Sequence, residues 1–173
     1  MSASAALPPV SRSALISPCG RYRYELWRRW DADRPTLYVG MLNPSKADAE
    51  RDDPTVRKVI GFGRRLGAGA IAIWNLYAYR ATNPRELTQV FDPIGPYNDA
   101  FLERLFVRAR LEGAICVAAW GAHAQAKRAD AVRDLMRDCG IGPMHWGLTQ
   151  SEQPRHPLML PYSTPLSPLF NAF

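Results

Sequence analysis

The feature that most constrains the fold of this chain is a short apolar run that ends abruptly in a polar turn. Residues 37–42 carry no charged side chain, and Asn43, Pro44 and Ser45 follow directly. This pattern is typical of a buried strand that stops at a turn. Further on, Asp53 before a proline predicts the N-cap of a helix. Since ligands of open α/β sheets bind where strands end and helices begin, we expect the loop between them to carry the functional site.

Three more apolar runs of strand length follow, and predicted helices separate all four. The predicted strands are residues 37–42, 70–76, 114–120 and 144–148, and the main predicted helices are residues 54–66, 98–112 and 122–139, with Asn98 as the cap of the second and Pro84 opening a further short helix. Strands that alternate with helices favour a parallel sheet covered on both faces. The expected fold class is therefore α/β: a three-layer α/β/α sandwich around a central, mainly parallel four-stranded sheet.

The two ends of the chain differ from this central part. Residues 1–20 are rich in serine, alanine and proline without a helical or strand period, so we expect a flexible arm. From Arg21 polar and apolar side chains alternate, which predicts a strand with one buried face. The proline-rich segment 153–173 is expected to wrap back over the sheet edge. The length of the chain fits one α/β domain over residues 21–173.

The composition favours an anionic partner and gives no sign of a membrane protein. The formal net charge is +6, which steers a protein toward nucleic acid or nucleotides. No apolar run reaches the roughly 18 residues of a membrane helix, and the N-terminus lacks a basic segment followed by an apolar one. We therefore expect a cytoplasmic protein. The composition leaves the oligomeric state open.

Motifs that would imply a cofactor or a metal are missing from the sequence. The glycines of residues 61–67 lie within or after a predicted helix and lack the spacing of a dinucleotide-binding turn. The three cysteines and three histidines are widely separated and show no metal-ligand spacing. We therefore expect no cofactor, no metal and reduced cysteines.

Two amides and one imidazole are the candidate chemical groups. Asn43 and Asn75 each end an apolar run, so parallel neighbouring strands would bring them to one sheet edge. An amide both donates and accepts hydrogen bonds, which lets such a pair place a water and read the edge of a planar base. His156 lies in a proline-constrained stretch where a fixed imidazole can face an anion. Each asparagine also fits a plain strand-ending turn, and the histidine also fits a structural role.

Five segments of the chain resemble a bacterial and phage family catalogued as domain of unknown function 1643. The segments are GMLNPSKAD, DDPTVRK, WNLYAYRATNP, VAAWGAHA and RHPLML, and the resemblance spans roughly residues 21–160. It implies membership of that family and no particular activity.

A more distant similarity is to the uracil-DNA glycosylase superfamily, which has an α/β sandwich with a central parallel sheet. Residues 40–45, GMLNPS, resemble its Gly-x-Asn-Pro-Gly motif, and residues 156–158, HPL, resemble its His-Pro-Ser motif. The resemblance implies that Asn43 positions the hydrolytic water and that His156 stabilises the oxygen of the departing base. It implies base- or substrate-binding roles for Asn75, which recognises the base, for Tyr77 as a stacking platform, for Ser45, and for Leu158 or Leu160 as a duplex wedge. The expected phosphate ligands are Lys46, Arg80 and Arg85.

The function expected from these features is hydrolysis of the N-glycosidic bond of a damaged or modified base in nucleic acid, in DNA repair or modification. A non-catalytic nucleic-acid or nucleotide binder is the first alternative, with phosphate ligands among Arg57, Lys58, Arg64, Arg80 and Arg85. A hydrolase or transferase that acts on free nucleosides or nucleotides is the second.

Overall fold

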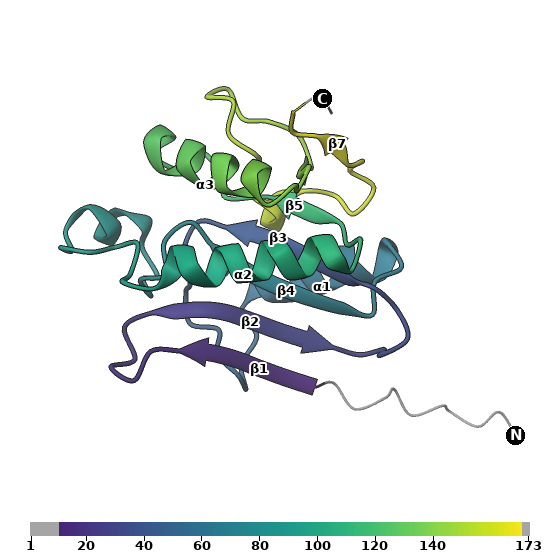
Figure 1. Cartoon of the computed structure of the whole chain (residues 1–173), viewed down its shortest axis with the longest axis horizontal. Coiled ribbons are helices and arrows are strands. Elements are labelled where there is room, and N and C mark those ends of the chain that lie inside the picture. The colour runs from purple at the N-terminus through teal and green to yellow at the C-terminus, as the bar shows by residue number, and fades with distance from the viewer. Residues whose placement is uncertain (1–10, 171–173) are drawn as a thin grey trace, which may run out of the picture.

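A mixed sheet runs through the centre of the computed structural model, which describes residues 11–170 (Figure 1). Its seven strands in this part of the chain are β1 (Ser11–Ile16), β2 (Arg23–Arg29), β3 (Thr36–Met41), β4 (Ala70–Asn75), β5 (Cys116–Ala118), β6 (Met144–His145) and β7 (Ser167–Pro168). They lie in the order β1-β2-β4-β3-β5-β6-β7. The four neighbours β4, β3, β5 and β6 are parallel, whereas β1, β2 and β7 pair antiparallel.

The expected α/β class is confirmed, but the predicted sheet of four strands was too small. The four predicted apolar runs contain the parallel strands, because β3, β4 and β5 are buried on both faces and therefore read as apolar runs. The sheet continues beyond them at both edges. The antiparallel edge strand β7 is two residues long, so its sequence carries no measurable alternation.

Strand β1 occupies residues that the sequence assigned to a flexible arm. Ser11–Ile16 pairs antiparallel with β2, with Ser11 opposite Arg29. Most of its side chains are exposed, so backbone hydrogen bonds hold the strand and no buried face marks it in the sequence. The rest of the predicted arm before Ser11 lies outside the described residues.

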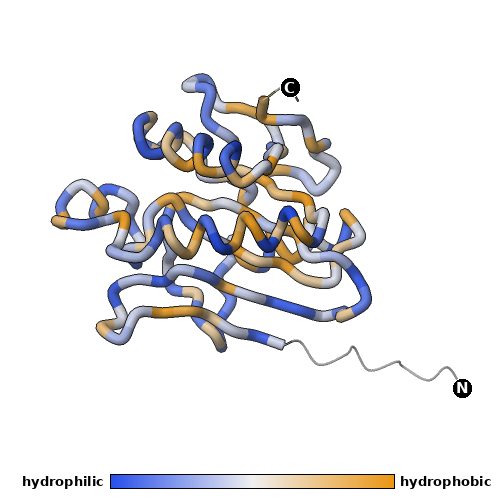
Figure 2. Tube along the Cα trace, viewed as in Figure 1, coloured by the Kyte–Doolittle hydropathy of each residue, from blue (hydrophilic) through white to orange (hydrophobic). Residues whose placement is uncertain are grey.

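Three α-helices and two short 3₁₀ helices of the described chain cover both faces of the sheet. They are α1 (Pro54–Arg65), α2 (Asn98–Leu111), α3 (Ala126–Asp138), η1 (Pro84–Thr88) and η2 (Pro157–Met159). Helices α2 and α3 pack on one face and α1 on the other, with an apolar side toward the sheet and charged residues outward (Figures 1 and 2). None of the described helices is both long enough and apolar enough to cross a bilayer.

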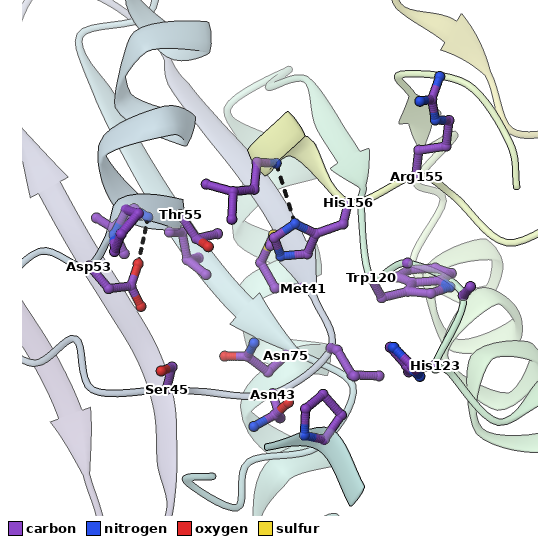
Figure 3. A pocket seen from close by; sticks show the side chains of 18 of the residues that line it. Met41, Asn43, Ser45, Asp53, Thr55, Asn75, Trp120, His123, Arg155 and His156 are labelled. Carbon is purple, nitrogen blue, oxygen red and sulfur yellow. Dashed lines mark hydrogen bonds between the residues drawn. The ribbon is translucent and has the colours of Figure 1, made fainter. Parts of the chain in front are cut away.

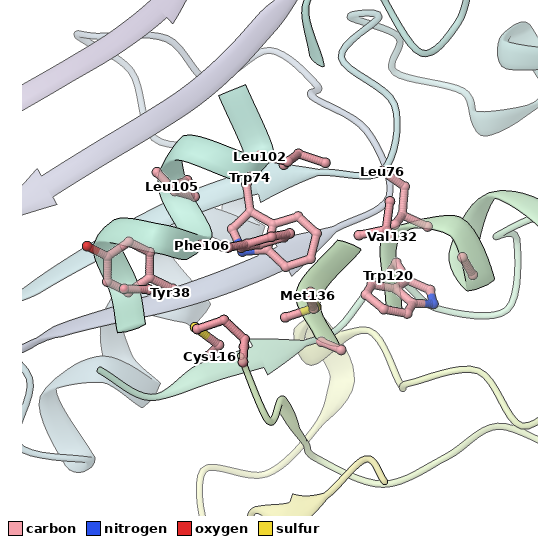
Figure 4. Close-up of a cluster of buried hydrophobic side chains, with 14 of the residues drawn as sticks. Tyr38, Trp74, Leu76, Leu102, Leu105, Phe106, Cys116, Trp120, Val132 and Met136 are labelled. Atoms are coloured by element: carbon pink, nitrogen blue, oxygen red, sulfur yellow. The ribbon is translucent and has the colours of Figure 1, made fainter. Parts of the chain in front are cut away.

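The larger core lies between the sheet and helices α2 and α3 (Figure 4). The rings of Trp74 and Phe106 meet edge to face with centroids 4.9 Å apart, and Trp120 lies 6.2 Å from Trp74. A Cβ atom at Gly40 would overlap the Trp74 ring. The glycine that opens the GMLNPS segment is therefore required by packing beneath the cavity described below.

Local signals placed the starts of both α1 and α2 correctly but assigned the wrong cap to α2. The Asp53 carboxylate accepts a hydrogen bond of 2.8 Å from the backbone N–H of Val56, as predicted for an N-cap. Helix α2 instead begins after Tyr97 without a side-chain cap. The predicted cap, Asn98, is buried, and its amide donates to the backbone oxygens of Asn75 and Leu76, both at 3.1 Å. Asn98 thus ties the start of α2 to the end of β4.

The C-terminal segment returns across the α1 face of the sheet. Leu160 is buried there, and Phe62 of α1 stacks on Trp146 and meets Tyr162 edge to face, with ring centroids 4.4 and 5.0 Å away. The described part of this segment ends in β7 at the edge of the sheet. The C-terminal segment therefore wraps back to the sheet edge as predicted. Its path brings η2 and His156 next to the start of α1.

Candidate functional site

A cavity of about 570 Å³ opens at the carboxyl ends of β3 and β4 (Figure 3). Its wall combines the ends of both strands with the first residues of α1, the loop after β5 and the segment around η2. The parallel register places Met41 opposite Asn75, so the residues that follow β3 and those that end β4 meet. This is the strand-end position that the sequence predicted for the site.

Most of the predicted site residues line this cavity. Asn43, Ser45, Asn75, His156 and Leu158 all contribute to its wall. Leu158 is 38% exposed at the cavity, so it can reach a bound macromolecule. The alternative wedge, Leu160, is 2% exposed and packs into the core against α1, so its side chain cannot enter a duplex.

Tyr77 does not line the cavity, and the stacking role expected for it does not fit the structure. Its ring is 3% exposed and belongs to the core between the sheet and helices α2 and α3. The backbone N–H groups of Leu76 and Tyr77 bond to the carbonyls of Met41 and Leu42, both at 3.0 Å. The strand-like path therefore continues past Asn75 and buries the side chains that follow it.

The predicted phosphate ligands divide between a second cavity and the open surface. Lys46 and Arg80 line a cavity of about 330 Å³, together with Arg21. Its wall shares Ser45, Ala81 and Thr82 with the first cavity. Arg85 is exposed in η1 and lines neither cavity, because the loop turns away at the capping box formed around η1.

The side chain of Asn43 is fixed by the backbone around it. Its Nδ2 donates to the carbonyl oxygens of Pro44 at 3.0 Å and Ala81 at 2.7 Å. Two carbonyl acceptors identify that end of the amide as the NH₂ group. The half-buried Asn43 therefore keeps its Oδ1 as an acceptor, which can orient a water through one of its protons.

Asn75 presents the opposite hydrogen-bonding group. Its side chain is 1% exposed, and its Oδ1 accepts a hydrogen bond of 3.3 Å from the guanidinium of Arg23. Its Nδ2 is buried and has no hydrogen-bond partner among the described residues. Buried donors are rarely left unpaired in native proteins, so this amide is ready to donate to a ligand.

Arg23 is a cavity residue that the sequence did not identify. It alternates with the apolar side chains of β2 and therefore looks like a solvent-facing residue, yet it is 3% exposed and lines the cavity. Its guanidinium also donates to the backbone oxygen of Ala47 at 2.8 Å. Burial lowers the pKa of Arg23 to about 10, so the side chain remains a cation at neutral pH.

His156 enters the cavity as a neutral hydrogen-bond donor. Its Nδ1 accepts from the backbone N–H of Leu158 at 3.3 Å, shown by the dashed line in Figure 3. The proton of the neutral ring is therefore assigned to Nε2. Burial lowers the pKa of His156, and the charge of Asp53 offsets this in part. The described residues contain no group of three His, Cys, Asp or Glu side chains that could hold a metal ion.

The lowered pKa of His156 leads to a testable pH dependence. We expect its imidazole to titrate with a midpoint below 6.5, because protonation places a charge in a buried site. The unfolded chain binds this proton more readily, so folding stability should fall as the pH drops from about 7 through the midpoint of the folded state. Titration of the ring C–H signals by NMR, with His156→Gln to assign the resonance, measures the midpoint. A midpoint at 6.5 or above would contradict the expectation.

Most of the residues that line this site fall within a segment of the chain that matches a known protein family. A family model described as "Protein of unknown function (DUF1643)" matches residues 23–158. No curated protein and no solved structure matches the chain. The matched residues contain all the side chains that line the first cavity except those of Met159 and Leu160.

Proposed function

We propose that this chain, which belongs to the DUF1643 family of proteins of unknown function, hydrolyses the N-glycosidic bond of a damaged or modified base in nucleic acid. One observation carries this proposal. Asn43, Asn75 and His156, from three distant parts of the chain, line a single cavity. They supply one acceptor for a water and two donors for a planar, carbonyl-bearing base.

The proposed chemistry follows from these hydrogen-bonding roles. Asn43 Oδ1 orients a water toward the C1′ atom of the sugar, where a C–O bond forms as the C1′–N bond to the base breaks. An amide cannot take up a proton at neutral pH, so the departing base must carry the electron pair and receive the proton released by the water. Asn75 Nδ2 and His156 Nε2 donate to the base and stabilise that charge.

The second cavity supports a ligand that carries phosphate. Arg21, Lys46 and Arg80 line it, and none of them forms an ion pair with an acidic residue in the described part of the chain. The two cavities lie next to each other, because both are lined by Ser45, Ala81 and Thr82. A base in the first cavity would thus leave its flanking phosphate beside three cations, which favours nucleic acid over a free nucleoside.

A panel of modified oligonucleotides tests the proposal. We expect purified full-length protein to convert at least one oligonucleotide carrying uracil, hypoxanthine or a modified pyrimidine into a product with an abasic site, detected by alkaline strand cleavage. Asn43→Ala should lose this activity, whereas Arg85→Ala should retain it because Arg85 lies outside both cavities. Free nucleosides belong in the same panel. Absence of product from every member, with no binding of any base, would overturn the proposal.

A non-catalytic nucleic-acid binder is the second candidate. It is favoured by the bonding of Asn43, whose NH₂ group is held by two backbone carbonyls and whose oxygen is a weak base. Such a protein would bind the same oligonucleotides with an affinity that falls steeply with salt, and would release no base. Product formation in the panel therefore separates the two candidates.

A further inference from the structure

Two buried side chains with unpaired donors form one wall of the first cavity. Asn75 is 1% exposed and Arg23 is 3% exposed, and both line the cavity. Asn75 Nδ2 and Arg23 Nε are each buried without a hydrogen-bond partner among the described residues. Of the eight unpaired buried side-chain atoms in the described part of the chain, these two belong to residues that line the first cavity, where a ligand can satisfy them. They indicate a ligand that brings acceptors.

The guanidinium of Arg23 decides which end of the Asn75 amide faces that ligand. A guanidinium has donors and no acceptor, so the amide end that meets it must be the oxygen. Arg23 is itself held in place, because it donates to the Ala47 carbonyl at 2.8 Å and to Asn75 Oδ1 at 3.3 Å. Figure 3 shows the amide nitrogen of Asn75 on the side nearer His156 and its oxygen turned away.

We propose that Arg23 is a positioning residue that locks the Asn75 amide with its NH₂ group toward the ligand, so that the cavity selects a heterocycle with a ring carbonyl and rejects one with an exocyclic amino group there. This inference rests on the proposed function and names the class of base. In a freely turning asparagine the amide could meet either group. Here an amino group would place its N–H bonds against the N–H bonds of Asn75, and a buried mismatch of this kind is costly.

The positive charge of Arg23 acts in the same direction. Arg23 forms no ion pair within 4.0 Å in the described part of the chain, so its positive charge is uncompensated at close range. Asp53, at the start of α1, is the carboxylate whose charge most favours the cationic form of Arg23. His156 adds a further donor through Nε2. The wall around Asn75 therefore favours the partial negative charge of a carbonyl oxygen.

Direct binding of free bases to the full chain tests this inference without relying on catalysis. The probes are two matched pairs, uracil with cytosine and hypoxanthine with adenine, and the readout is the ratio of dissociation constants within each pair. We expect the wild-type protein to bind uracil more tightly than cytosine, and hypoxanthine more tightly than adenine, each by at least about tenfold. Arg23→Gln should bring the ratio close to one, because a glutamine amide can donate or accept and lets the Asn75 amide turn. Arg23→Lys should restore the preference, because an ammonium group has donors alone.

Asn75→Asp provides a second, nearly isosteric test if Arg23→Gln fails to fold. It replaces the inward NH₂ group by an acceptor, so we expect the preference to shift toward cytosine and adenine. If Arg23 serves stability alone, Arg23→Gln will weaken the binding of both members equally and leave the ratio unchanged, which overturns the inference. Equal affinity of the wild-type protein for both members of each pair overturns it as well. Failure to bind or excise any base refutes the proposed function itself.

Discussion

Replacing His156 with alanine is expected to slow base release by about a hundredfold to a thousandfold. The imidazole supplies a fixed N–H donor in a buried cavity, and removal of one donor to a developing oxyanion has an effect of this size in other enzymes. His156→Gln, which can place an amide N–H in the cavity, should recover part of the loss. Single-turnover release of the base from an oligonucleotide that the wild-type protein cleaves is the appropriate measurement, because it isolates the chemical step.

The control for this prediction is Arg85→Ala, which removes an exposed charge outside both cavities. Its rate should remain within about twofold of wild type, since surface substitutions of this kind seldom disturb a fold. A His156→Ala rate within about threefold of wild type, with intact folding, would show that the imidazole does not stabilise the leaving base.

The parts of the fold that could be predicted from the sequence are those with local causes. Asp53 caps α1 because its own carboxylate reaches the N–H of Val56 three residues later. The parallel strands were predictable because burial on both faces leaves an apolar run. Strand β1 was not, since its exposed side chains follow no pattern and its backbone pairs with β2. Asn98 was misassigned because its amide bonds to β4, which is far away in the sequence.

The site residues at the strand ends were predictable from the sequence. Those whose burial depends on tertiary contacts were not. Asn43 and Asn75 meet because β3 and β4 are parallel neighbours, as their position in the sequence suggested. The position of Tyr77 was predicted wrongly because its backbone continues to bond to the segment after β3, beyond the end of β4, and its ring is buried. Arg23 carried no signal at all. Its alternation with apolar residues predicts a solvent face, yet the side chain is buried and bonds to Ala47 and Asn75, which are distant in the sequence.

A second buried arginine, Arg28, organises the loop that leads into the cavity. Its side chain is fully buried, and its Nε donates to Asp52 Oδ1 at 2.7 Å. The other guanidinium nitrogens donate to the backbone oxygens of Ser13, Trp27, Asp48 and Arg51. One side chain therefore joins β1 and β2 to the loop immediately before the Asp53 cap of α1.

Replacing Arg28 with methionine is expected to lower the free energy of unfolding by about 3–5 kcal/mol, because breaking a buried ion pair leaves its partners unpaired. Asp52 would keep only the partly exposed Arg12, at 3.7 Å, as an ion-pair partner among the described residues. The measurement is urea unfolding followed by circular dichroism. The matched control is Arg34→Met, which breaks an exposed pair with Asp31 and should cost less than about 1 kcal/mol. If Arg28→Met also costs less than about 1 kcal/mol, the loop is held by other contacts. A loss of about 3–5 kcal/mol would show that Arg28, which does not line the cavity, is a main support of the loop before Asp53.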